Sequence, residues 1–145
     1  MNSQGPGQVL FHFVRHWASR PVAADVGGER GRLVTVCEAV YSLCQRGTAT
    51  TVNAIAHEVG IDQSGASRLI KSAKSAGYLA MAASPSDGRQ REASLTPAGL
   101  SMLEQAHRWQ EDVFAQLTTT WNDKRRRDFY AAMRELMDSS YTMDT

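Results

Sequence analysis

The chain has 145 residues, of which 42% are hydrophobic and 21% charged, the balance of one globular domain rather than of a disordered protein. Its longest apolar run, residues 78–83, is too short to cross a bilayer, and its first residues lack the basic and apolar regions of a secretion signal. Two cysteines are too few for a disulfide scaffold, so we expect a cytoplasmic protein with no membrane contact.

The net charge of +1 conceals an uneven distribution. Residues 63–91 contain five basic side chains and one acidic side chain, a local charge of +4. A basic stretch on a nearly neutral chain favours binding to a polyanion, although a solvated charged face would have the same composition.

Apolar residues recur at helical spacing in the first half of the chain and predict four helices there. Their apolar stripes cover residues 9–17, 33–44, 52–59 and 66–73. Pro21 ends the first helix, and Asp62 or Ser64 caps the fourth. The glycines that follow the other stripes are predicted helix stops: Gly47, Gly60 and Gly77.

The pattern then changes to that of a β-hairpin followed by two helices. Residues 78–83 and 91–95 read as two strands separated by turn-forming residues. Thr96 caps the next helix, of about 20 residues, and Pro97 fills its first position. Asn122 or Asp123 starts the last helix. This order predicts a mainly α fold, a winged helix-turn-helix with a two-stranded β wing. The first and last helices carry more apolar residues than such a domain can cover, so they are expected to be dimerisation helices; these residues include Phe11, Phe13, Trp17, Phe129, Met133 and Met137.

The helix-turn-helix covers residues 52–70 and carries the strongest chemical signal. Gly60 supplies the tight turn, and Ile61 is expected to fill the gap between the two helices. With the apolar residues of both helices buried, the second helix exposes short hydrogen-bonding groups and one guanidinium, which suit base edges and phosphates in a major groove. The alternative is a helical hairpin that binds nothing.

Three segments in order resemble the MarR (multiple-antibiotic-resistance regulator) family: the helix-turn-helix, Lys74–Leu79, and the run from Ser84–Gln90 to Leu95–Gly99. The resemblance implies a homodimeric winged helix protein that binds double-stranded DNA at a near-palindromic site and is often released by a small molecule or an oxidant. It also implies that Arg89 enters the minor groove while Asp87 holds the wing tip. The residues predicted to contact DNA are Gln63, Ser64, Ser67, Arg68, Lys71, Asp87, Arg89 and Arg91.

Other candidate functional side chains each allow two interpretations. The aromatic residues Trp17, Tyr41 and Trp109 could line an effector pocket, although core or dimer contacts are commoner roles for them. Cys37 and Cys44 lie on an apolar stripe and are expected to be buried and inert rather than oxidant sensors.

Two further groups are weaker candidates. His12 and His16 have a spacing that suits a metal, but no third ligand is evident, so we expect no metal and no cofactor. The basic run over 124–127 is expected to be a solvated face.

These observations predict a dimeric transcriptional regulator, a repressor rather than an activator, without catalytic activity. We expect a dimerisation helix and loop over 1–32, the DNA-binding domain over 33–96 and dimerisation helices over 97–145. A winged helix used only for protein interaction would show no salt-dependent affinity for duplex DNA, and a small enzyme would need His12, His16 or Cys37 to converge in a pocket.

Overall fold

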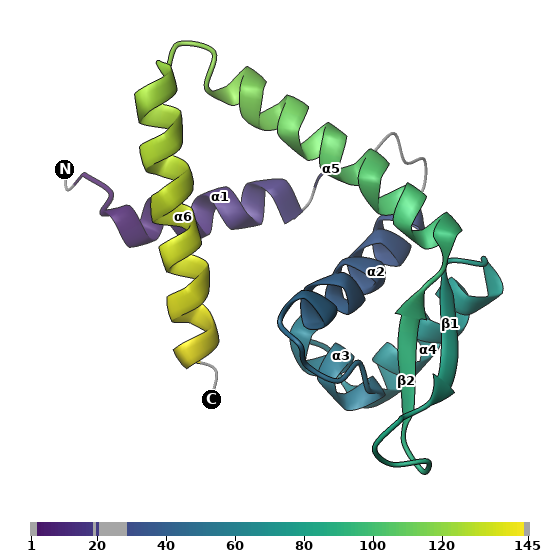
Figure 1. The fold of residues 1–145 in the computed structure, drawn as a ribbon. Helices are drawn as coiled ribbons and strands as arrows, with labels where there is room; N and C mark the ends of the chain where they lie inside the picture. The colour runs from purple at the N-terminus through teal and green to yellow at the C-terminus, as the bar shows by residue number, and fades with distance from the viewer. Residues whose placement is uncertain (1–2, 19, 21–28, 144–145) are drawn as a thin grey trace. The chain divides into compact units, whose positions relative to one another are not determined.

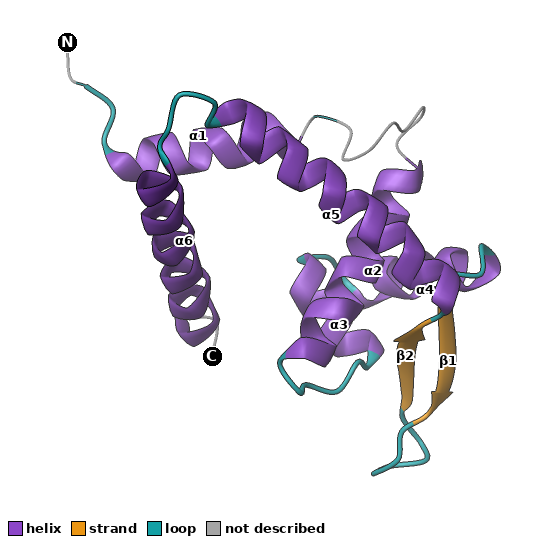
Figure 2. Ribbon diagram, turned by 45° about the horizontal axis from the view of Figure 1, so that its top comes forward, coloured by secondary structure: helices purple, strands orange, loops and turns teal. Residues whose placement is uncertain are grey.

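The computed structural model describes residues 3–18, 20 and 29–143 (Figure 1). The chain forms two compact units, Met1–Trp109 and Gln110–Thr145. Figure 2 shows that helices dominate and that the two strands form one hairpin. In chain order the elements are α1 (Pro6–Ala18), α2 (Glu29–Gln45), α3 (Val52–Val59), α4 (Gln63–Ser75), β1 (Leu79–Ala83), β2 (Arg91–Leu95), α5 (Pro97–Leu117) and α6 (Asp123–Met143).

The element order expected from the sequence is confirmed, together with most of the predicted helix ends. Gly47, Gly60 and Gly77 all have the positive φ that ends a helix without a Cβ penalty. Of the two candidate caps for α4, Asp62 is the one used, and its Oδ1 accepts the Gly65 N–H at 2.8 Å. Pro21, expected to end the first helix, lies outside the described residues.

The core of the first unit surrounds α2, which is buried on most of its circumference. Every other element of the DNA-binding region contributes to it, because Ile55, Ile70, Leu79 and Ala93 come from α3, α4, β1 and β2. Leu103 of α5 is only 1% exposed. Each large apolar side chain buried in this way contributes about 1.5–3 kcal/mol, so the core fixes where the helix-turn-helix and the wing stand relative to each other.

The expected role of Ile61 is wrong. Its side chain is 37% exposed at the turn between α3 and α4 and does not fill the gap between them. The buried residues of the two helices include instead Ile55 and Ala56 of α3 and the small Ala66 of α4.

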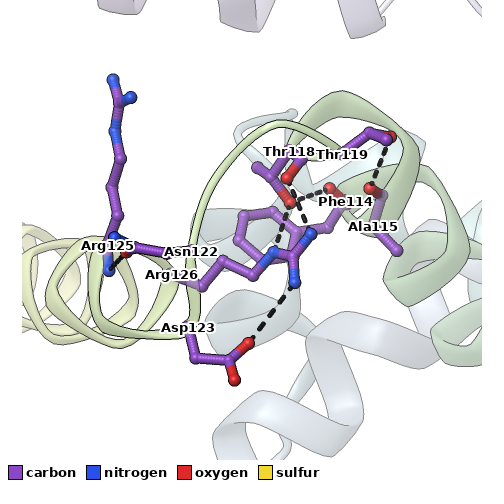
Figure 3. A network of polar contacts seen from close by, with 8 residues as sticks. All are labelled: Phe114, Ala115, Thr118, Thr119, Asn122, Asp123, Arg125 and Arg126. Carbon is purple, nitrogen blue, oxygen red and sulfur yellow. Dashed lines mark hydrogen bonds and ion pairs between the residues drawn. The ribbon is translucent and has the colours of Figure 1, made fainter.

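In the second unit, Lys124, Arg125 and Arg127 of the basic run are exposed, as expected of a solvated face, whereas Arg126 is half-buried and bonded internally (Figure 3). Arg126 donates from Nη2 to the Thr118 carbonyl at 2.7 Å and from Nε to the Thr118 hydroxyl at 3.1 Å. Arg125 stacks over the Trp121 ring at 4.5 Å, and Lys124 pairs with Asp128. Arg126 and Arg125 therefore hold the turn between α5 and α6, whereas the Lys124–Asp128 pair lies within α6.

Both terminal helices carry exposed apolar side chains. None of the described residues of α1 or α6 is buried. Within the second unit, Phe114, Trp121 and Phe129 form an aromatic cluster with ring centroids 5.3–6.5 Å apart, yet Phe129 remains 40% exposed. The larger exposed apolar residues of the two helices are Val9, Leu10, Phe11, Phe13, Val14, Phe129, Tyr130, Leu136, Met137 and Met143.

Candidate nucleic-acid interface

Helix α4 has one face packed on the core and an opposite face that is polar and exposed. Ala66, Ile70 and Ala73 are buried at the spacing of one helical face. The five residues of α4 predicted to contact DNA are all exposed: Gln63, Ser64, Ser67, Arg68 and Lys71. The short side chains leave the helix backbone accessible, so a groove of suitable width can approach it closely.

The turn before α4 fixes the angle between the two helices of the motif. Thr51 caps α3 by accepting the Ala54 N–H at 3.2 Å. At the other end, Gly60 has φ 82° and its N–H donates to the Ala56 carbonyl at 2.9 Å. A residue with a Cβ is strained in this conformation, which is why a glycine here is a reliable sequence signal.

The β-hairpin projects its exposed tip beyond the paired strands. Ala83 pairs with Arg91, and the Ser84 N–H donates to the Gln90 carbonyl at 2.8 Å. At the tip, Asp87 accepts the Arg89 N–H on its side chain at 3.0 Å, an arrangement typical of an Asx turn. Asp87 therefore holds the tip, as expected.

Two of the predicted wing residues differ in what their side chains do. Within the described residues, the Arg89 guanidinium is exposed and has no hydrogen-bond or ion-pair partner. Arg91 donates from Nη2 to the Met81 carbonyl at 3.3 Å, so part of its donor capacity is already used across the hairpin.

A connection between the wing and the helix-turn-helix had no signal in the sequence. Thr50, only 6% exposed, donates its hydroxyl to the Ala93 carbonyl at 2.6 Å, and the Ala93 N–H donates to the Thr50 carbonyl at 3.0 Å. The next residue, Thr51, forms a bridge with Glu92. The residues just before α3 thus pair with the middle of β2 and join the wing to the motif that carries α4.

The aromatic residues expected at an effector pocket fall into two pairs in the first unit. Trp17 and Trp109 make an edge contact at 6.3 Å, and the Tyr41 ring lies 5.7 Å from that of His107. His107 Nε2 is 2.6 Å from Glu38 Oε1, which links α5 to α2. All three predicted residues are half-buried, and an effector pocket around them stays a prediction.

The expectation for the cysteines is right for one and wrong for the other. Cys37 is fully buried, and its burial, with a smaller contribution from the Glu38 carboxylate, raises the pKa of its thiol to about 11. Cys44 is exposed, because the apolar stripe of α2 turns away from the core before the helix ends at Gln45.

Two further chemistries find no support in the described part of the chain. It contains no group of three or more side chains able to hold a metal ion, so His12 and His16 stand without a third ligand there. None of the helices it contains is both long and apolar enough to span a membrane.

The sequence matches no protein-family model and no curated protein. Its structure is similar to that of MarR, with a TM-score of 0.72, 16% identity, and coverage of 99% of this chain and 96% of that one. BpsR of Bordetella bronchiseptica, whose DNA binding is regulated by 6-hydroxynicotinic acid, has a TM-score of 0.62 at 21% identity and covers 95% and 96%. PcaV of Streptomyces coelicolor, solved with its natural ligand, has a TM-score of 0.58 at 16% identity and covers 97% and 99%.

Proposed function

We propose that this chain, which has the winged helix fold of MarR-type regulators, is a cytoplasmic repressor that binds double-stranded DNA as a homodimer. The observation that carries the proposal is the joining of an exposed polar helix and an exposed arginine tip within one packed unit. Helix α4 has the dimensions and chemistry for a major groove, and Arg89 suits the narrow, electronegative minor groove beside it. The proposal includes no catalytic step.

The connection at Thr50 supports simultaneous contact with both grooves. A hairpin held only at its ends would swing, whereas here the middle of β2 is bonded to the residues that start α3. Since α3 and α4 share one core, a force on the wing tip is transmitted to α4. Phosphate contacts made by the wing thereby also fix the position of α4 along the DNA duplex.

The exposed apolar residues of α1 and α6 support the dimer. Phe11 is 63% exposed and Phe13 53%, and exposed apolar patches of this kind mark interfaces. A two-fold dimer presents two α4 helices about 34–36 Å apart, one turn of DNA, so its site is a near-palindrome.

The release signal is a small molecule in this proposal. The Tyr41–His107 pair offers a flat apolar surface beside the Glu38 carboxylate, and the Trp17–Trp109 pair offers a second aromatic surface in the same unit, which suits a small aromatic ligand. BpsR provides a precedent for such regulation in a chain of the same fold.

The test is a mobility-shift titration with the duplex upstream of the chain's own gene and a scrambled duplex of equal length and composition. The proposal expects a protein–DNA complex on the first duplex at concentrations that leave the second unbound, with affinity falling as salt rises. Equal binding to both, or binding that does not respond to salt, contradicts it and favours a winged helix that binds proteins only.

A further inference from the structure

A cleft of about 470 Å³ lies beside α4, between its first turns and the start of α2. Its walls carry two guanidinium groups, those of Arg32 and Arg68, above apolar side chains that include Leu33 and Leu69. Among the described residues, neither guanidinium has a hydrogen-bond or ion-pair partner. Because neither guanidinium is bonded to the acids that border the cleft, both keep donors free for an acceptor that comes from outside.

The Arg68 guanidinium lies in this cleft beside Gly65. Its Nη2 lies 3.8 Å from the point where a Cβ at Gly65 would be, so the guanidinium folds back along the helix instead of extending from the exposed face. Gly65 itself lines the cleft. Base edges and phosphates are both possible partners of the Arg68 guanidinium, and its position at the cleft favours a phosphate.

At 3.6 residues per turn, Gly65, Leu69 and Ser72 lie on the flank of α4 that borders the cleft, whereas Ser64, Arg68 and Lys71 start on the side opposite the buried residues. When a helix enters a major groove, base edges face its outermost side and the phosphate backbones face its flanks. Arg68 starts on the outermost side, but its guanidinium reaches back to the flank beside Gly65, and Arg32 lies across the cleft from α4.

The geometry points to Arg32 and Arg68 as a clamp for one phosphodiester of the DNA backbone in each half-site. This inference rests on the proposed function and assigns base reading on α4 to its short polar side chains. A guanidinium fork matches the non-bridging oxygens of a phosphate, and two forks complete the set of donors that one phosphate accepts. Arg32 lies outside the segment that the sequence marks as basic.

Two acids also border the cleft and set a limit on its affinity. Asp62 accepts the Gly65 N–H on Oδ1 at 2.8 Å, and its remaining negative charge beside Arg68 opposes a phosphate. Glu29, in the first turn of α2, faces the same space and repels a phosphate. Replacing Glu29→Gln is therefore expected to tighten binding of any duplex.

The experiment compares Arg32→Ala, Arg68→Ala and the double variant with wild type by fluorescence anisotropy. The probes are a duplex selected from a random pool by the wild-type protein and a scrambled duplex, each over a range of salt concentrations. Arg127→Ala is the matched control, since it removes one exposed positive charge from α6. Thermal melting and light scattering confirm that every variant is folded and associated as wild type is.

Each single variant is expected to bind both duplexes about ten-fold more weakly than wild type, with the salt slope reduced by about 1 for each phosphate that the protein no longer neutralises. The double variant is expected to lose less than the product of the single losses, because both arginines hold the same phosphate. A methylphosphonate at one position per half-site is expected to weaken wild type and to leave Arg32→Ala almost unaffected.

The clamp is overturned if Arg32→Ala binds like Arg127→Ala, or if Arg68→Ala loses affinity only for a particular base pair. A wild-type protein that prefers no sequence, yet loses salt-dependent affinity in both variants, contradicts the proposed regulator and supports the clamp. The two failures are therefore distinguishable.

Discussion

The backbone carbonyl of Tyr78 occupies the space that a Cβ at Gly99 would need. The α-carbon of Gly99, in the first turn of α5, passes directly over the residue before β1, and the Thr96 N–H donates to the same Tyr78 carbonyl at 3.1 Å. Thr96 also donates its hydroxyl to the Gly77 carbonyl at 2.5 Å and accepts the Gly99 N–H at 3.1 Å. This contact seats α5 on the end of α4 and the start of the wing.

Replacing Gly99→Ala is expected to destabilise the protein. The added methyl meets backbone rather than a flexible side chain, so the helix must shift, at a cost of about 1–3 kcal/mol. Gly7→Ala is the matched control, since it lies in α1 with no atom within 4 Å of the new methyl. Chemical denaturation measures both, and equal free energies of unfolding for the two variants would show that the contact is not tight.

Replacing Thr50→Val is expected to loosen the wing without unfolding the chain. The substitution removes the bond to the Ala93 carbonyl and leaves that oxygen without its partner, a loss of about 1–3 kcal/mol, whereas Thr50→Ser keeps it. Hydrogen exchange at the Ala93 amide reports the local opening. The account expects faster exchange in the valine variant alone, and identical protection in both variants argues against the connection.

Stability is expected to fall in acid partly through Glu58. The Arg46 guanidinium, at 2.7 Å from Oε2, lowers the pKa of Glu58 below its ordinary value of 4.5. A lowered pKa stabilises the fold fully above about pH 4.5, and this stabilisation disappears as the pH falls through the lowered value. Both side chains are partly exposed, so the contribution is about 1 kcal/mol or less.

The variant Glu58→Gln isolates this contribution. Thermal melts from pH 7 to pH 3 are expected to show a smaller difference from wild type at the acid end, because wild type loses the pair there. Asp128→Asn breaks a far more exposed pair with Lys124 and is expected to change nothing measurable. If Glu58→Gln keeps the same deficit at pH 3 and pH 7, the ion pair is not its cause.

The two cysteines are expected to differ in reactivity. With its pKa raised to about 11, the buried Cys37 stays a protonated thiol at neutral pH, whereas Cys44 is exposed. Iodoacetamide on the native protein is expected to label Cys44 only, and both residues after denaturation, as read by mass spectrometry. Labelling of Cys37 at the rate of Cys44 in the native protein would contradict its burial.

The parts of the fold that depend only on residues adjacent in the sequence could be predicted from the sequence. Gly60 and the Thr96 cap are local signals. A positive φ favours glycine, and an unpaired N–H at the start of a helix favours a side chain that accepts it, whatever the rest of the chain does. Ile61 and Cys44 were placed wrongly because periodicity gives the direction of a stripe but not where the opposing surface ends.

The exposure of the candidate residues on α4 and at the wing tip could be predicted from the sequence, whereas the contacts of Arg32 and Thr50 could not. Arg32 and Thr50 acquire their roles only when segments separated by many residues meet, Arg32 at the cleft with α4 and Thr50 at the strand carrying Ala93. Neither has a motif of its own. Likewise, Arg126 reads as one of four basic residues until the turn after α5 brings the Thr118 carbonyl to it.

The central claim is that α4 and the wing bind adjacent grooves of one duplex, and Arg89→Ala tests it most directly. The measurement is a titration of wild type and variant, at fixed salt, against the selected palindrome and a copy whose A·T-rich flanks are replaced by G·C pairs. The account predicts that wild type loses affinity on the flank-replaced duplex and that Arg89→Ala binds both duplexes equally and more weakly, by about 1–3 kcal/mol on the A·T-flanked site. A variant that binds every duplex as tightly as wild type would contradict it.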